Sequence, residues 1–177
     1  MTTVRSLRPE ERDDVRALLT EAYQQYETAM TPIAYGPYMT SVLNTDDGDT
    51  FVAVDDGKLL GSARLFLPGT APLALRKPLD WANPMPADWA WVRAVGVRPA
   101  ARGTGVAAAL MRHCAENATG ATAILLHTMD FMPGAIQLYE RLGYERAPEF
   151  DFHAGRAAAV SPEDMFFAIA YRLTLVR

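Results

Sequence analysis

The sequence predicts a single α/β domain with a mixed central sheet, in which parallel strands lie in the middle and antiparallel strands lie outside them. The length of 177 residues favours one domain, which we place at residues 1–177. Over residues 91–142 a strand, a helix, a strand and a helix follow one another, an order typical of parallel strands with helical crossovers. Two strand-like runs joined by a tight turn within residues 50–67 add an antiparallel hairpin.

The composition is that of a globular protein without disulfides. Hydrophobic residues make up 50% of the chain and charged residues 21%, so there are enough apolar side chains for a core. The 17 basic and 21 acidic residues give a net charge of −4, which argues against a nucleic-acid-binding protein because such proteins usually carry a basic surface. The single cysteine, Cys114, cannot form an intrachain disulfide.

The N-terminal segment does not look like a targeting signal. The first 16 residues are rich in charge and lack the apolar run of a signal peptide. No apolar run in the sequence approaches the roughly 18 residues that a membrane span needs. We therefore expect a cytoplasmic protein that does not bind a membrane.

The first half of the chain is predicted to contain a strand, two helices and the hairpin. Residues 2–7 alternate weakly between apolar and polar side chains, as a strand does. Pro9 suits the first turn of a helix, and apolar residues follow it at helical spacing as far as Tyr26. A shorter helix is expected over residues 36–45.

The hairpin is followed by an irregular segment. Its strands are residues 50–54 and 59–67, joined by a turn at 55–58 in which Gly57 takes the left-handed conformation. Residues 68–88 contain five prolines, which exclude a long helix or a central strand. This segment is either a lid over a functional site or a plain surface loop.

The second half is predicted to alternate between strands and helices. The expected elements are a strand at 91–97, a loop at 98–105, a helix at 106–117, a strand at 123–128, a helix at 133–142, and two final strands at 144–152 and 165–176. Gly143 ends the second of these helices. Pro148 cannot donate a ladder hydrogen bond, so we expect a bulge or an edge position around it.

A glycine-rich turn leads from a predicted strand into the following helix. The first amides of a helix have no partner within the helix and carry the positive end of its dipole, so they can bind an anion. Gly103 and Gly105 remove side chains that would keep a phosphate from these amides, and Ala107 is the next smallest choice. Arg98 and Arg102 add positive charge nearby. The segment therefore predicts a phosphate- or pyrophosphate-binding loop.

Two other interpretations of this turn stay open from the residues alone. A Gly-x-Gly turn also occurs as a tight connection that binds no ligand. A nucleotide-binding enzyme can use such a loop as well, but this one lacks the Gly-Lys-Ser/Thr ending of a P-loop. Ala108 also stands where a dinucleotide-binding motif has its third glycine.

Two segments resemble the signature motifs of the GNAT superfamily of N-acetyltransferases. Residues 102–107, Arg-Gly-Thr-Gly-Val-Ala, match its Arg/Gln-x-x-Gly-x-Gly/Ala motif, and residues 95–99 look like the strand end before it. Residues 135–144 look like its second signature helix and the strand that follows. Both motifs occur in the right order with a strand between them. The resemblance covers residues 89–152 and implies that they form an acyl-CoA-binding core.

The resemblance implies a mixed, mostly antiparallel sheet with a splayed parallel strand pair in its middle and helices on both faces. It implies acetyl-CoA, or another short acyl-CoA, as cofactor, with the pyrophosphate on the loop amides. The backbone of Val95 and Val97 would pair with the pantetheine arm, and the Val95 amide would donate to the thioester oxygen. The cofactor-binding residues that it implies are Val95, Val97, Arg102, Gly103, Gly105, Val106 and Ala107.

The same resemblance implies a catalytic residue. Tyr139 matches the tyrosine with which this family often protonates the leaving thiolate, although a core tyrosine on an amphipathic helix has the same spacing. The general base stays open, because the strand before the loop carries Arg93 where some family members have a glutamate. The candidates for the base are Asp130, Asp151, His127, His153 and a chain of water molecules. We expect no metal site, because no cluster has the spacing of metal ligands.

One function is expected and two alternatives remain. We expect an enzyme that transfers an acetyl group from acetyl-CoA to a primary amine, on a small molecule or a peptide, by direct attack in a ternary complex. The first alternative is a non-catalytic acyl-CoA-binding or sensing domain, because the strand carboxylate is missing and Met132 precedes the second motif where the family often has an asparagine. The second is a nucleotide-binding enzyme. A homodimer is compatible with the sequence, whereas nucleic-acid partners are not expected.

Overall fold

A mixed β-sheet runs through the centre of the protein, and helices pack on both of its faces. The computed structural model describes residues 1–71, 84–154 and 166–176. The strands are β1 (Thr3–Ser6), β2 (Asp49–Asp55), β3 (Lys58–Phe66), β4 (Trp89–Val97), β5 (Ala123–Met129), β6 (Glu145–Arg146), β7 (Phe152–Ala154) and β8 (Phe166–Thr174). The helices are α1 (Arg12–Tyr23), α2 (Pro32–Leu43), α4 (Val106–Asn117) and α5 (Pro133–Arg141). None of these helices combines the length and the apolar character needed to cross a bilayer.

The sheet has the predicted mixture of strand directions. Within the described ranges it has eight strands in the order β1-β2-β3-β4-β5-β8-β6, and β7 pairs with β8 outside this path. Only β4 and β5 are parallel, and every other described pair is antiparallel. The fold class predicted from the sequence is therefore confirmed.

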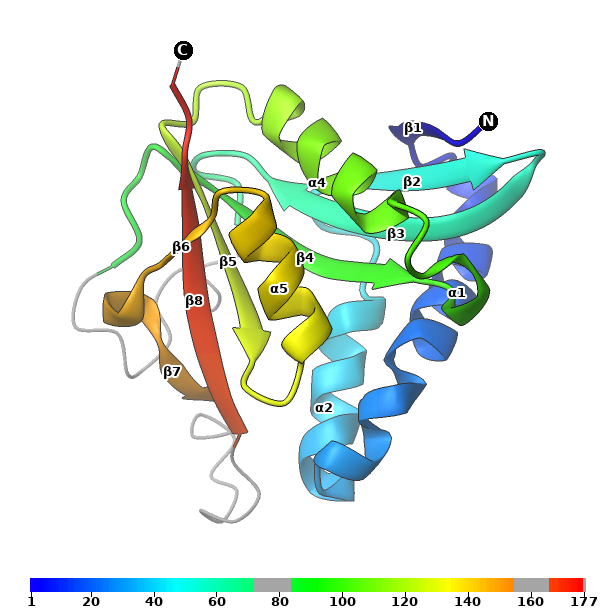
Figure 1. Cartoon of the computed structure of the whole chain (residues 1–177), viewed down its shortest axis with the longest axis horizontal. Coiled ribbons are helices and arrows are strands. Elements are labelled where there is room, and N and C mark those ends of the chain that lie inside the picture. The colour runs from blue at the N-terminus through cyan, green and yellow to red at the C-terminus, as the bar shows by residue number, and fades with distance from the viewer. Residues whose placement is uncertain (72–83, 155–165, 177) are drawn as a thin grey trace.

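The parallel strands β4 and β5 separate along their length. They pair only between residues 89–92 and residues 123–126, and the later residues of each strand do not pair with the other strand. Figure 1 shows β4 and β5 starting together and diverging, with α5 in front of the gap between them. The splay leaves one edge of β4 open in the middle of the sheet.

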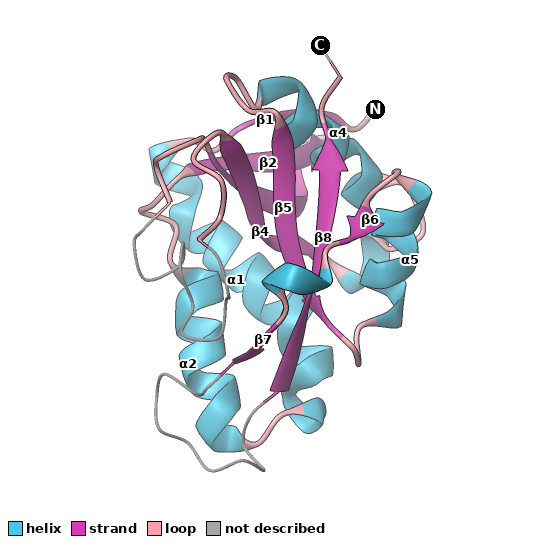
Figure 2. Ribbon diagram, turned by 90° about the vertical axis from the view of Figure 1, so that its left-hand side faces the viewer, coloured by secondary structure: helices cyan, strands magenta, loops and turns pink. Residues whose placement is uncertain are grey.

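Alternation along the strands sends side chains to both helical layers. Val52 of β2 packs in a cluster with Leu18 of α1, whereas its neighbours Phe51 and Ala53 pack in the cluster that contains Leu110 of α4. Figure 2 shows α1 and α2 on one side of the sheet and α4 and α5 on the other. The sheet is thus buried on both faces.

The elements of the first half largely follow the sequence. β1, α1 and the hairpin of β2 and β3 form where they were predicted, and Asp56 and Gly57 at the hairpin turn have positive φ values of 46° and 74°. The second helix begins at Pro32 and not at residue 36, because Pro32 fits the first turn, where a missing amide has no consequence.

In the second half one predicted strand is wrong. Residues 144–152 do not form one strand but split into β6, a 3₁₀ turn at Pro148–Phe150, and β7. The reason is that Pro148 has no amide for the ladder and instead starts the turn. Both strand pieces still pair with β8. The lid predicted for residues 68–88 falls mainly on residues 72–83, which lie outside the described residues.

Candidate active site

A bulge shapes the open edge of β4. Between the pairs Ser62–Gly96 and Arg64–Arg93, β4 has one more residue than β3. Ala94, inside this stretch, has a φ of +51°, a left-handed conformation that a residue with a side chain seldom adopts. The extra residue changes which backbone groups of β4 point toward β3 and which point toward the gap between β4 and β5.

After the bulge, the backbone of Val95 and Val97 faces the gap. The Arg98 amide donates to the Leu60 carbonyl at 2.9 Å, so Arg98 pairs with β3. Because alternate residues of a strand direct their amides the same way, Val95 and Val97 direct theirs to the other side. The Val95 carbonyl accepts a hydrogen bond there from the Tyr23 hydroxyl of α1 at 3.1 Å. Both predicted pantetheine-pairing residues therefore lie on the open edge.

Helix α1 approaches the bulge closely enough to bring Tyr23 into this position. A Cβ atom at Gly96 would lie 2.8 Å from the Leu19 side chain and 3.3 Å from the Ala22 Cβ atom, both on α1. Only glycine leaves room for this packing. Sequence reasoning missed Tyr23 as a site residue. Its one signal was its position on the apolar face of α1, which a core tyrosine shares.

The glycine-rich turn between β4 and α4 has an open side. Gly103 and Gly105 have positive φ values of 77° and 88°, and a Cβ atom at either position would have no other atom within 4 Å. The first hydrogen bond of α4 runs from the Ala109 amide to the Gly105 carbonyl at 3.0 Å. The amides that come before it are left for other partners.

Most of the predicted anion-binding amides are available. Within the described chain, the amides of Gly103, Gly105, Val106 and Ala107 donate no hydrogen bond, whereas the Arg102 amide donates to the Pro99 carbonyl at 3.2 Å. These four amides stand at the positive end of the α4 dipole, where an anion is stabilised. Their arrangement can accept a phosphate group.

The two arginines of the turn fix it to α1. The Arg102 guanidinium donates to the Ala22 carbonyl at 2.9 Å and to the Gln25 side chain at 3.1 Å, and Arg98 forms an ion pair with Glu21. The sequence predicts that both side chains add positive charge beside the loop. Their contacts show that they also hold the turn against the C-terminal end of α1.

Tyr139 lies on α5, buried beside other tyrosines. Its ring centroid is 5.8 Å from that of Tyr144 and 6.3 Å from that of Tyr171, and 5% of the residue is exposed. Burial raises its pKa well above the usual value, and the phenol groups of Tyr23, Tyr144 and Tyr26 raise it further. Tyr139 belongs to the hydrophobic cluster against which Val95 and Val97 of the open edge pack, and its phenol is protonated at neutral pH.

Two of the residues considered for the general base have structural roles. His127 is enclosed on the sheet, where its Nε2 donates to the Phe150 carbonyl at 2.9 Å, and burial lowers its pKa to about 4. Asp151 forms an ion pair with Arg146 at 2.7 Å and accepts from the Ala170 amide at 2.7 Å.

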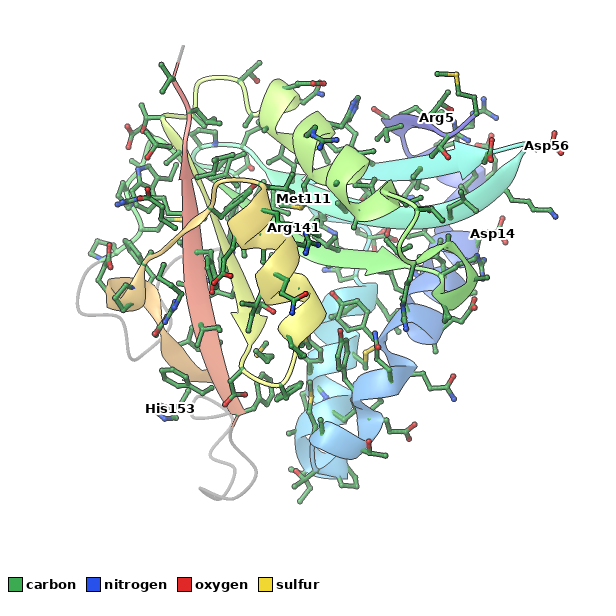
Figure 3. The ribbon with its side chains drawn as sticks, in the orientation of Figure 1. Arg5, Asp14, Asp56, Met111, Arg141 and His153 are labelled. Atoms are coloured by element: carbon green, nitrogen blue, oxygen red, sulfur yellow. The ribbon has the colours of Figure 1, made fainter. Side chains whose placement is uncertain are left out.

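The remaining candidates for the base are exposed. Asp130 is exposed at the start of the connection from β5 to α5. His153 lies on β7 at the far edge of the molecule, as Figure 3 shows. The described ranges contain no group of three or more His, Cys, Asp or Glu side chains that could hold a metal ion.

The comparison with protein families decides which family this site belongs to. The model of the acetyltransferase (GNAT) family matches residues 12–144, which include α1, the splayed strands, the glycine-rich turn and α5. The chain belongs to the GNAT acetyltransferase family. Among curated proteins, no match was found.

Solved structures of GNAT acetyltransferases share the fold. The ribosomal-protein-S18-alanine N-acetyltransferase of Escherichia coli is 18% identical, with a TM-score of 0.66 over 100% of this chain and 96% of that one. The yncA protein of Salmonella typhimurium, solved with its cofactor acetyl-CoA, is 13% identical, with a TM-score of 0.65 over 100% and 95% of the two chains. NAA60 of Arabidopsis thaliana, solved with a bisubstrate analogue, is 17% identical, with a TM-score of 0.61 over 98% of each chain.

Proposed function

We propose that this acetyltransferase transfers an acetyl group to a primary amine by direct attack in a ternary complex. The cosubstrate is acetyl-CoA or another short acyl-CoA, in line with the relatives that were solved with acetyl-CoA. One observation carries the proposal. The amides of the glycine-rich turn, which have no partner among the described residues, follow directly after the open edge of β4. A ligand bound by these amides could therefore extend along that edge into the gap between β4 and β5.

Each part of the cosubstrate has matching groups on the protein. The amides of Gly103, Gly105, Val106 and Ala107 suit the pyrophosphate, because they offer several donors at a helix N-terminus. The Val95 and Val97 backbone suits the pantetheine arm, whose amides can pair with a strand edge as an added strand would. The cosubstrate supplies the activated acetyl group as a thioester.

The residues around the gap account for the chemistry of transfer. The amine nitrogen forms a bond to the thioester carbon, and the Val95 amide donates to the carbonyl oxygen as negative charge develops on it. As the carbon–sulfur bond breaks, the Tyr139 phenol gives its proton to the departing thiolate. Asp151 is held in an ion pair with Arg146, so water takes the proton that the amine loses, and water returns a proton to the Tyr139 phenolate at the end of the cycle. The products are the N-acetylated amine and the free thiol.

A binding measurement and a turnover assay together test the proposal. Calorimetry of the whole chain with acetyl-CoA should show binding at one site. A thiol-release assay over a panel of primary amines should then show release that depends on the amine, with the acetylated product identified by mass spectrometry. Binding without release for every amine would support the sensing domain, and absence of binding would contradict the role of the turn.

A further inference from the structure

A buried arginine and a partly exposed one lie side by side under α2. Arg64 of β3 and Arg93 of β4 are register partners in the antiparallel ladder. Arg64 is 2% exposed and donates to the Val42 carbonyl at 2.9 Å, whereas Arg93 is partly exposed and donates to the Ser41 hydroxyl at 3.0 Å. Both guanidinium groups therefore point toward the last turn of α2, where the helix dipole favours positive charge.

Neither arginine has a carboxylate partner in the part of the chain that the structure describes. Burial lowers the pKa of Arg93, and the side chains that act against this are the phenols of Tyr38 and Tyr23. Other arginines of the chain do form ion pairs, such as Arg5 with Glu11 at 2.6 Å. Burial also lowers the pKa of Arg64, and there the carboxylates of Asp47 and Asp46 act against it. No carboxylate of the described residues is among the groups that shift the pKa of Arg93. A cation held away from water without a counter-ion is unfavourable, so the position of Arg93 requires an explanation.

Arg93 lies on β4 at the point where β4 and β5 separate. It directly follows Val92, the last residue of β4 that pairs with β5, and it precedes Val95 by two residues. At the usual rise of a strand, Arg93 is about 7 Å from Val95, a span that a flexible arginine side chain can bridge. Its guanidinium carbon lies 5.4 Å from the centroid of the Trp91 ring.

The rings of Tyr23, Tyr38 and Phe166 form an aromatic wall on the α2 side of the sheet, and its two phenols act on this guanidinium. The ring of Tyr38 is 5.9 Å from that of Tyr23 and 5.5 Å from that of Phe166 on β8. Such a wall lowers the local polarity and so strengthens any charge–charge contact made there. Arg64 is enclosed, so Arg93 is the one of the two that a ligand can reach.

We infer that Arg93 binds a carboxylate of the acceptor, and that the acceptor is a primary amine of amino-acid size which carries that carboxylate. This rests on the proposed function. A guanidinium binds a carboxylate with two parallel hydrogen bonds, and the acceptor would supply the counter-ion that the described residues do not provide for Arg93. The same contact would hold the amine a few atoms away, beside the Val95 amide.

Matched pairs of acceptors test the inference without any mutation. Each pair is an amino acid with a neutral side chain and its carboxamide, which differ only in the carboxylate. The amine of a carboxamide loses its proton more easily, so chemistry alone favours the carboxamide. We expect kcat/KM to be about 100-fold higher for the amino acid, because loss of one partner of a hydrogen-bonded charge pair weakens binding by a factor of this order.

Substitution of Arg93 then separates binding from a structural role. Arg93→Gln should lower kcat/KM for the amino acid about 100-fold and leave the carboxamide nearly unchanged, so that the discrimination disappears. Arg93→Lys should restore part of it. Arg172→Gln is the control, because Arg172 also lies over a tryptophan, 5.7 Å from the Trp89 ring, but has Glu145 at 3.9 Å. It should leave both rates unchanged.

Three results would overturn the inference. The first is an equal kcat/KM for amino acids and their carboxamides in the natural protein. The second is an equal fall in both values in Arg93→Gln. The third is a failure to acetylate any amine that carries a carboxylate, although the protein binds acetyl-CoA. Acetylation of amines without a carboxylate would then leave the proposed function intact. Failure to bind acetyl-CoA, measured by calorimetry, would instead remove the proposed function itself.

Discussion

At the residue scale, Tyr139 is suited to give a proton and not to take one. Burial raises its pKa far above neutrality, and neighbouring phenols add to the effect. A phenol in such surroundings is protonated at neutral pH, so it has a proton to donate as the carbon–sulfur bond breaks. The burial that makes Tyr139 resemble a core residue is therefore compatible with its proposed role.

Tyr139→Phe should lower kcat about 100-fold, because it removes a general acid, a contribution of roughly this size in other enzymes. The dissociation constant for acetyl-CoA should change less than about three-fold, since the ring and its packing stay. Stopped-flow thiol release and calorimetry measure the two quantities. The control is Tyr144→Phe. The Tyr144 hydroxyl is buried and has no hydrogen-bond partner among the described residues, and its ring is 5.8 Å from that of Tyr139. A loss of turnover shared equally by both variants would argue against an acid role for Tyr139.

The residues of the site differ in how far the sequence could predict them. The glycines at 103 and 105 could be predicted because the motif is continuous along the chain. The Tyr23–Val95 and Arg93–Ser41 contacts could not, since they join residues that are 72 and 52 positions apart. Only the close packing of α1 and α2 on β4 brings these pairs together.

At the element scale, the turn before α4 combines local strain with open space. Gly103 and Gly105 have the backbone of left-handed residues, yet nothing fills the space that a side chain would take. The space lies beside amides that have no partner within the described chain. The turn therefore keeps its donors exposed at the cost of a conformation that only glycine adopts easily.

Gly105→Ala should weaken acetyl-CoA binding at least ten-fold, because relief of about 1–2 kcal/mol of left-handed strain would rotate the amides away from the anion. Gly57→Ala in the hairpin turn is the matched control, since Gly57 has a φ of +74° and equally open surroundings. It should lower thermal stability by a similar free energy and leave the affinity unchanged. Calorimetry and thermal unfolding of both variants check this, and equal affinities would contradict an anion-binding turn.

The helices and strands show where the spacing of apolar residues predicts the structure and where it does not. α4 and β5 were predicted closely because their apolar residues repeat without interruption. The β4 bulge has no signal in the sequence, since Ala94 has ordinary strand neighbours and no glycine marks its left-handed backbone. The strand predicted at 144–152 is interrupted at Pro148, because the preference of proline for a turn outweighs the apolar pattern there.

At the scale of the whole molecule, two titrating groups favour the folded state above acidic pH. Burial lowers the pKa of His127 to about 4 from 6.5, so below pH 6.5 the unfolded chain takes up a proton that the folded chain refuses. The hydrogen bond from Arg5 lowers the pKa of Glu11 to about 2 from 4.5. Glu11 therefore stabilises the fold above pH 4.5 and loses this effect as the pH falls toward 2.

The free energy of unfolding should fall as the pH is lowered from 7 to 4.5, with His127 contributing about 2–3 kcal/mol of the loss. His127→Gln, which keeps a donor for the Phe150 carbonyl but does not titrate, should lose correspondingly less over the same interval. Urea unfolding of both proteins at the two pH values measures the difference. Parallel pH profiles for the two proteins would mean that His127 is not the group responsible.

The short parallel ladder also decides how the protein holds together. Four residue pairs join β4 to β5, while longer ladders run through the strands on either side. The sheet therefore consists of two halves, which are joined by hydrogen bonds along the first part of β4 and β5 and are separate along the rest. A cosubstrate lying between the separated parts of β4 and β5 would contact both halves of the sheet. Its binding would therefore stabilise the folded protein, and its release would lower that stability again.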